Sequence, residues 1–340
     1  MRSGKNRGMP TLSLRGSVCV RLFLILCIFT ISFSGFVNAG QRSQTDERTK
    51  PVPYASDKII IARNPLPPAV YMVQNKKILV AVRFFPKGTK PEEAPWSTNG
   101  TGFVVAPGVV TTARHILFDG IATVERNGMK PNEYEYDFVG TIITSTGIIN
   151  FPLTLAYTTD AQSLRGVMFL RVDAQTLQKA TMPPQLTSTV DPRQPNIQIV
   201  QPIGIENPYR MLAEPLEFDD VNIGDQVYVT GITPVSAPRV STDGKITSIL
   251  ADIIDFTFEG EVVSVIENMP INKYGVQRMY RIHGNGEPGY SGGMLLTSKG
   301  KVAGFIEATS ATSVQTGNFL FILSSKDIKN SLDDFRKQKK

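Results

Sequence analysis

The chain has 340 residues, enough for one large domain or two medium ones with a sizeable buried core. Hydrophobic residues make up 41% and charged residues 19%, a composition typical of a globular rather than a disordered protein. The formal net charge of +6 depends on residues 1–39, which are basic and hold no acidic residue. Without that segment 31 basic residues face 30 acidic ones, which leaves no basic footprint for a nucleic acid.

The cysteines and histidines limit the chemistry that the chain can perform. Both cysteines, Cys19 and Cys27, lie in residues 1–39, so removal of that segment would exclude disulfides, thiolate catalysis and cysteine metal sites together. The two histidines, His115 and His283, are too few for a multi-histidine metal centre. We therefore expect neither a metal ion nor a cofactor.

Residues 1–39 have the layout of a secretory signal peptide. A basic segment precedes a mostly apolar run over 22–37, and Val37-Asn38-Ala39 supplies a small-residue cleavage site before Gly40. The apolar run is shorter than the ~20 residues that a spanning helix prefers, which favours a cleaved signal over an uncleaved anchor. We expect a periplasmic or secreted protein with no stable membrane span after cleavage, and a flexible polar lead-in over residues 40–70 with one short strand at 58–62.

From residue 71 to 337 the sequence predicts one domain built of short strands between turn signals. The predicted strands are 78–85, 102–105, 109–112, 150–157, 167–172, 226–230, 261–266, 279–282, 294–297, 302–308 and 319–323. Their spacing is typical of barrels or sandwiches, and no helix is predicted between them. A connector over about 174–211, richer in Pro, Gln and Asn, separates a first set at about 77–173 from a second set at about 212–323. No role is assigned to the longer insertions at about 116–150 and 173–211.

One helix is predicted at the end of the domain, over 325–336. Ser324-Ser325-Lys326-Asp327 resembles a capping box, and Ile328, Leu332 and Phe335 recur on one helical face. The predicted fold class is therefore all-β, with two antiparallel β units and a closing C-terminal α-helix.

The segment Gly286-Glu287-Pro288-Gly289-Tyr290-Ser291-Gly292-Gly293 places a serine among glycines. Such a turn can aim the amides of Gly289 and Ser291 into one small volume, as an oxyanion hole requires. The alternative is a glycine-rich hairpin with an incidental serine. A nucleophile elbow of the α/β-hydrolase type is excluded, because two apolar strands follow Ser291 instead of a helix and both histidines precede it.

A second segment, Gly100-Thr101-Gly102-Phe103-Val104-Val105-Ala106-Pro107-Gly108-Val109-Val110-Thr111-Thr112-Ala113-Arg114-His115, reads as a hairpin with a histidine at its exit. A lone histidine is more often structural than catalytic. Beside a glycine-cradled serine, however, it is the side chain whose pKa suits removal of the serine proton at neutral pH.

These two segments resemble the histidine hairpin and the nucleophile loop of trypsin-like serine proteases, especially the exported bacterial HtrA/Deg type. The strand Ile223-Gly224-Asp225-Gln226-Val227-Tyr228-Val229 is similar to the one opening that family's second barrel, and Asn318-Phe319-Leu320-Phe321-Ile322 is similar to its closing strand. The matches run in the family's order over roughly residues 80–335. The resemblance implies two perpendicular, six-stranded antiparallel β-barrels with an active site in the cleft between them. We expect no PDZ module after the closing helix.

By this resemblance, Ser291 would be the nucleophile, His115 the general base and then the general acid, and the amides of Gly289 and Ser291 the oxyanion hole. Met294 stands where the family usually has proline. The family's third member, an aspartate that opens the strand at 167–172, is replaced by Gly166.

Three interpretations of this replacement stay open. In the first, an aspartate from elsewhere takes its place: Asp160 on the preceding loop, or, as weaker candidates, Asp119 or Asp173. In the second, Ser291 and His115 act as a dyad, oriented by a backbone carbonyl or water. In the third, the protein is inactive.

The functional prediction is an exported serine endopeptidase that acts on a protein or peptide substrate. The alternative is a catalytically weak or inactive protease-fold binding or scaffold protein in the same compartment. The first specificity pocket would be lined by residues near 281–287 and 305–309, where His283 and Glu307 are the polar candidates. For His283 a partly exposed strand position is favoured.

Overall fold

The computed structural model describes residues 65–144, 147–159, 166–182, 189–190, 198–199, 207–240, 246–267, 278–284, 289–310 and 319–338. The predicted signal peptide, the strand at 58–62 and Asp160 lie outside these ranges. The chain divides into two compact units, and the description below concerns the larger, Ala55–Thr309 with Asn318–Lys340. Within the described ranges, no helix combines the length and apolar character needed to cross a bilayer.

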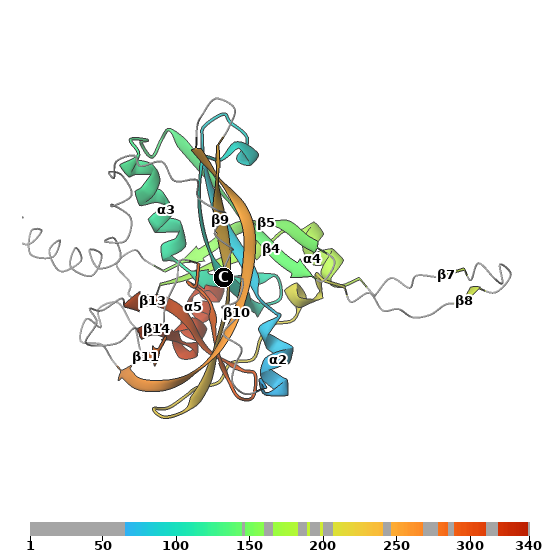
Figure 1. Ribbon diagram of the computed structural model, residues 1–340, viewed down its shortest axis with the longest axis vertical. Helices are drawn as coiled ribbons and strands as arrows, with labels where there is room; N and C mark the ends of the chain where they lie inside the picture. Colours follow the sequence, from blue (N-terminus) through green and yellow to red (C-terminus); the bar gives the residue numbers. More distant parts are fainter. Residues whose placement is uncertain are drawn as a thin grey trace, which may run out of the picture. The chain divides into compact units, whose positions relative to one another are not determined.

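The first six strands form a closed antiparallel barrel in the order β1-β2-β3-β6-β5-β4, of which Figure 1 labels β4 and β5. The strands are β1 (Ile78–Pro86), β2 (Trp96–Ala106), β3 (Val109–Ala113), β4 (Tyr134–Thr144), β5 (Gly147–Thr158) and β6 (Val167–Val172). Alternate residues of β1, such as Val80, Val82 and Phe84, are fully buried in the barrel core. This is the alternation that a strand with one face inward requires.

The second barrel is also closed, in the order β10-β11-β14-β13-β12-β9. Its strands are β9 (Gln226–Val240), β10 (Ile246–Glu267), β11 (Arg278–His283), β12 (Met294–Thr297), β13 (Val302–Ser310) and β14 (Phe319–Ser324). The pairing of β9 with β10 runs from the Gln226–Glu261 pair at one end to the Val240–Ile246 pair at the other. The two strands therefore form a hairpin far longer than the predicted strands at 226–230 and 261–266 (Figure 1). Two closed six-stranded barrels confirm the predicted all-β double-barrel architecture.

The closing helix α5 (Ser325–Lys337) begins at its predicted cap. Ser324 Oγ accepts a hydrogen bond from the Asp327 amide at 3.2 Å and donates one to the Asp327 carboxylate at 2.9 Å. The apolar face of the helix, with Ile328, Leu332 and Phe335, is buried with β-strand residues from both barrels. The helix thus helps to hold the two barrels together through one shared apolar cluster.

The prediction of no helix between the strands was wrong. The structure has α3 (His115–Arg126) and α4 (Ala174–Ala180) between strands, with short 3₁₀ turns η2 (Pro91–Glu93) and η3 (Arg210–Ala213). A further helix, α2 (Pro68–Gln74), precedes β1. Helix α3 buries Ile116, Leu117 and Val124 against the first barrel, while Gly120 lies against the Phe84 ring, where a side chain would overlap it.

Strand β4, also unpredicted, closes the first barrel from within the insertion at 116–150. A further pair, β7 (Thr189–Val190) and β8 (Gln198–Ile199), lies in the connector.

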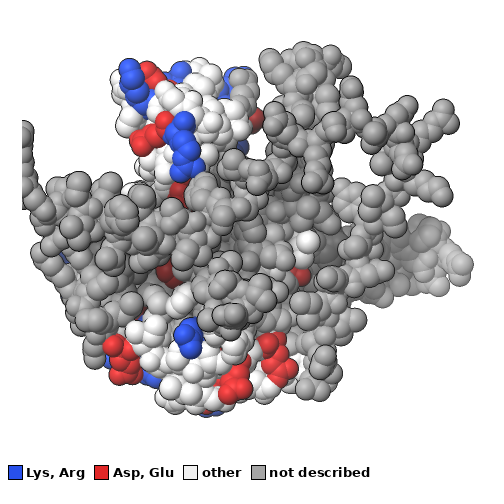
Figure 2. All heavy atoms as spheres, turned by 60° about the vertical axis from the view of Figure 1, so that its left-hand side comes forward, with Lys and Arg blue, Asp and Glu red and all other residues white. Residues whose placement is uncertain are grey.

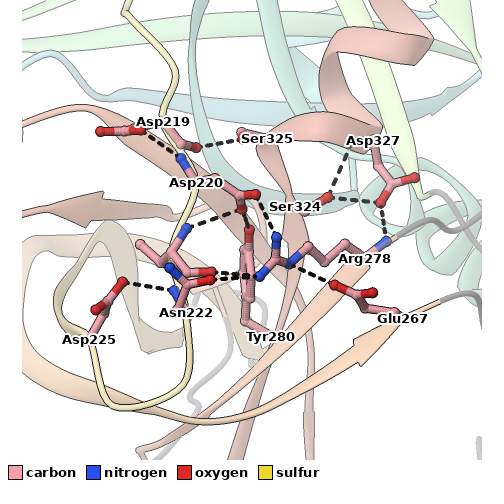
Figure 3. Close-up of polar contacts among 11 residues, drawn as sticks. Asp219, Asp220, Asn222, Asp225, Glu267, Arg278, Tyr280, Ser324, Ser325 and Asp327 are labelled. Carbon is pink, nitrogen blue, oxygen red and sulfur yellow. Dashed lines mark hydrogen bonds and ion pairs between the residues drawn. The ribbon is translucent and has the colours of Figure 1, made fainter.

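A polar network holds the segment at residues 219–225, which leads into β9, against Arg278 and Tyr280 of β11 (Figure 3). Arg278 donates from Nη1 to the Asp220 carboxylate at 2.6 Å, and the Tyr280 hydroxyl donates to the same carboxylate. The Arg278 amide donates to Asp327 Oδ2 at 3.0 Å, which extends the network to α5. Burial, followed by the hydrogen bond and the charge of Asp220, raises the pKa of Tyr280, so this hydroxyl stays a donor.

A buried lysine joins the start of the first barrel to the second. Lys77 precedes β1, and its Nζ donates to Thr230 Oγ1 on β9 at 2.8 Å and to the Asp255 carboxylate on β10. The Lys77 side chain is 2% exposed, whereas that of Asp255 is 51% exposed. At the surface, Lys and Arg side chains and Asp and Glu side chains are interspersed over the described residues in view in Figure 2.

Candidate active site

His115 and Ser291, 176 positions apart in sequence, meet between the two barrels. His115 Nε2 lies 2.6 Å from Ser291 Oγ. The histidine is the first residue of α3, separated from β3 of the first barrel by Arg114 alone, and the serine lies in the turn before β12 of the second. The structure therefore brings together the two side chains that the sequence singled out, at hydrogen-bonding distance.

The serine turn requires its glycines. Gly289 has φ +94° and Gly292 has φ +80°, values in the left-handed region that favours glycine. A Cβ on Gly292 would overlap the Thr101 carbonyl of β2. The Ser291 carbonyl in turn accepts a hydrogen bond from the Thr101 amide at 2.7 Å, so the turn is fastened directly to the first barrel.

The turn is also held within the second barrel. The Gly292 amide donates to the Ile306 carbonyl at 2.8 Å, and the Gly293 amide donates to the Tyr290 carbonyl at 2.9 Å. Within the described part of the chain, no hydrogen bond engages the amides of Gly289 or Ser291. These two amides are the predicted oxyanion donors.

An aromatic stack supports the same turn from the long hairpin. The rings of Tyr290 and Phe256 lie 3.8 Å apart between centroids, with an interplanar angle of 22°. Phe256 is paired in register with Gly231 on β9, and its ring lies so close to that glycine that a Cβ would overlap it. Tyr290, the residue before Ser291, is thus held by the Phe256 ring, which itself packs against Gly231.

A carboxylate of the second barrel faces the other nitrogen of the histidine ring. Glu307 Oε1, on β13, lies 3.9 Å from His115 Nδ1. The side chains of His115 and Glu307 are only 29% and 16% exposed. Gly166 lies against this carboxylate, and a Cβ on that glycine would overlap it.

The pKa values of His115 and Glu307 reflect this contact. Burial lowers the pKa of His115, but the interaction with Glu307, aided by the charge of Asp119, outweighs burial and the opposing charge of Arg114, so the His115 pKa is raised. Burial raises the pKa of Glu307 by more than His115 and Arg114 lower it. The imidazolium form of His115 is therefore stabilised by a carboxylate held in a poorly solvated place.

The aspartates considered from sequence lie elsewhere. Asp173 caps α4 by accepting a hydrogen bond from the Thr176 amide at 3.0 Å, and Asp119 is an exposed residue one turn into α3. Asp160 is outside the described residues. His283 is exposed, as expected, with its ring 4.6 Å from that of Phe319.

Sequence reasoning grouped Glu307 with His283 as a pocket-lining candidate and missed its position beside His115. One signal was present, because Glu307 is an isolated acidic residue in the otherwise uncharged strand Val302–Ser310. For metal binding, no cluster of three or more His, Cys, Asp and Glu side chains is suitably placed within the described ranges.

Comparisons with known proteins find similarity in structure only. No protein family model matches the sequence, and no curated protein matches it. Among solved structures, the inactive form of a serine-to-alanine mutant of Rv3671c from M. tuberculosis H37Rv aligns with 80% of this chain and 91% of its own, at 16% identity and a TM-score of 0.39. The inactive form of the Rv3671c protease aligns with 79% of this chain and 93% of its own, at 17% identity and a TM-score of 0.40.

The described strands define the topology by themselves: two closed six-stranded antiparallel barrels are followed by a closing helix. The chain has the double-barrel fold of the trypsin-like serine proteases.

Proposed function

We propose that the protein is an exported serine endopeptidase in which Ser291 is the nucleophile and His115 the general base. The observation that carries this proposal is the 2.6 Å contact between His115 Nε2 and Ser291 Oγ across the two barrels. A serine hydroxyl becomes an effective nucleophile when an adjacent base accepts its proton, and this contact supplies such a base. Export rests on the signal-peptide pattern of residues 1–39, and the peptide substrate on the family resemblance.

The reaction follows from these positions. Ser291 Oγ attacks the scissile carbonyl carbon while its proton passes to His115 Nε2, and the carbonyl oxygen becomes an oxyanion. The amides of Gly289 and Ser291 would donate hydrogen bonds to that oxyanion. His115 then gives its proton to the leaving amine. In the second half of the reaction His115 accepts a proton from water, the water oxygen attacks the acyl carbon, and Ser291 Oγ leaves with the proton that His115 returns.

The turn around Ser291 supports this assignment over an incidental serine. The fastening of the Ser291 carbonyl to Thr101 and of the Gly292 amide to Ile306 holds the hydroxyl in place before a substrate arrives. Such preorganisation lowers the reorganisation needed in the transition state.

A fluorophosphonate probe tests the proposal, because it phosphonylates activated serines. We expect labelling of the wild-type protein at Ser291, mapped by mass spectrometry, and hydrolysis of an unfolded protein such as casein. Ser291→Ala should abolish both, and His115→Ala should reduce both by about 10³-fold or more.

The exposed histidine provides a matched control, since His283→Ala should leave labelling unchanged. Absence of labelling of the folded wild-type protein between pH 6 and 9 would contradict the proposal. It would favour the binding or scaffold alternative.

A further inference from the structure

We propose that Glu307 is the carboxylate that orients His115, and that Gly166 provides the space that admits it. This inference rests on the proposed function. It assigns the orienting carboxylate to β13 of the second barrel, the barrel of the serine, whereas the family resemblance places it on the strand that begins at residue 167 in the first barrel.

The two nitrogens of the His115 ring face the two groups that such a mechanism needs. Nε2 lies 2.6 Å from Ser291 Oγ, and Nδ1 lies 3.9 Å from Glu307 Oε1. The second distance is that of an ion pair, and a movement of about 1 Å would make it a hydrogen bond. Contacts of this kind are often long without substrate and shorten in the reacting complex.

Gly166 explains how the carboxylate reaches this place. The Gly166 carbonyl accepts a hydrogen bond at 2.6 Å from the amide of Arg114, the residue before His115. A side chain at residue 166 therefore starts beside the histidine, where the family's aspartate would lie. In this protein a Cβ there would overlap the Glu307 carboxylate. The Glu307 carboxylate thus fills the space that a side chain at residue 166 would otherwise take.

The burial of Glu307 indicates a role beyond packing. Its Oε2 is buried and has no hydrogen-bond partner among the described residues. A buried carboxylate without full hydrogen bonding is unfavourable, and such groups gather where function requires them. The imidazolium that His115 forms during the reaction would provide the compensating charge.

The other charged groups around His115 are less suited to this role. Asp119 lies on the same helix and is exposed, and Arg114 carries the opposite charge. Asp173 is engaged at the start of α4. Among the described residues, Glu307 is the carboxylate that approaches Nδ1 within 4.0 Å.

The first test measures the His115 pKa by NMR and does not depend on activity. The chain has only two histidines, so each ring signal is assigned by replacing the other histidine. Glu307→Gln keeps the size of the side chain but removes its charge, so the imidazolium loses stabilisation and the His115 pKa should fall. Asp119→Asn removes a second nearby charge and should lower that pKa by less. The His283 signal serves as an internal control and should not move.

The second test is a double-mutant cycle that moves the carboxylate from Glu307 in the second barrel to residue 166 in the first. Glu307→Ala should lower kcat/KM by about 10²–10⁴-fold, as loss of the orienting carboxylate does in serine proteases. Gly166→Asp alone should also lower it, because two carboxylates compete for one space. The double variant Gly166→Asp/Glu307→Ala should exceed the activity of Glu307→Ala by about tenfold or more, a coupling expected for groups in contact. In this double variant the His115 pKa should rise again.

Two results would overturn the inference. One is an unchanged His115 pKa in Glu307→Gln, and the other is a double variant no more active than Glu307→Ala when circular dichroism shows both to be folded. Failure of the proposed function would look different. The wild type would neither label nor hydrolyse casein, whereas the NMR titration would still report whether Glu307 interacts with His115.

Discussion

Replacement of Phe256 tests whether the long β9–β10 hairpin supports the turn that holds Ser291. Phe256→Ala removes the ring that stacks on Tyr290 at 3.8 Å, the residue directly before Ser291. We expect the turn to populate its reactive arrangement less often, with a lower kcat and a nearly unchanged KM.

The size of the effect follows from the contact. Stacked aromatic pairs contribute about 0.5–1.5 kcal/mol beyond the area that they bury. If that stabilisation is lost from the reactive arrangement alone, the rate falls by about twofold to 13-fold, at about 1.36 kcal/mol for each factor of ten.

The assay is the rate of fluorophosphonate labelling at Ser291 together with kcat for a peptide substrate. Phe258→Ala is the matched control, because Phe258 stacks on Phe256 with a centroid distance of 6.1 Å and takes no part in the Tyr290 pair. A Phe256→Ala protein that melts at a lower temperature but labels at the wild-type rate would refute the reasoning. The ring would then contribute to stability only.

Two further predictions concern stability. Ser324→Ala removes the cap of α5 and should reduce the free energy of unfolding by about 1 kcal/mol, measured by urea denaturation; an unchanged midpoint would show that the cap contributes little. Asp255→Asn leaves the buried Lys77 ammonium without its counter-charge and should reduce the free energy of unfolding at pH 7 by about 1–3 kcal/mol. Burial lowers the Lys77 pKa despite Asp255, so the folded protein releases this proton at a lower pH than the unfolded chain does. The contribution of Lys77 to the free energy of unfolding should therefore rise with pH between the folded-state pKa and about 10.4. A contribution that does not change with pH in this range would contradict this account.

The fold could be predicted largely because its signals are local. The strand at 167–172, the strand at 294–297 and the cap at Ser324 each follow from a few adjacent residues, and the structure has them at those positions. Helix α3 was missed although Ile116, Leu117, Gly120 and Val124 recur on one face. No element was assigned to the insertion at about 116–150, so this periodicity was not used. The lengths of β9 and β10 were missed because their outer parts pair with each other, and propensity over a short window does not report such pairing.

The site divides in the same way. Ser291 and His115 were identifiable because each lies in a distinctive local pattern. The neighbour of His115 was not, because Glu307 approaches it from another barrel, 192 positions further along the chain. Gly166 was recognised as a missing carboxylate, but a sequence does not show what fills the space that a glycine leaves. That information is tertiary, and it appears only when β13 and the loop before β6 are brought together.

The formation of an acyl-enzyme on Ser291 tests the central claim most directly. Rapid mixing with p-nitrophenyl acetate should release a burst of about one p-nitrophenolate per protein, and mass spectrometry after acid quench should find the acetyl group on Ser291. The burst should disappear in Ser291→Ala and in His115→Ala. A wild-type protein with no burst, or a burst that persists in Ser291→Ala, would contradict the claim that these two side chains form a reactive pair across the barrels.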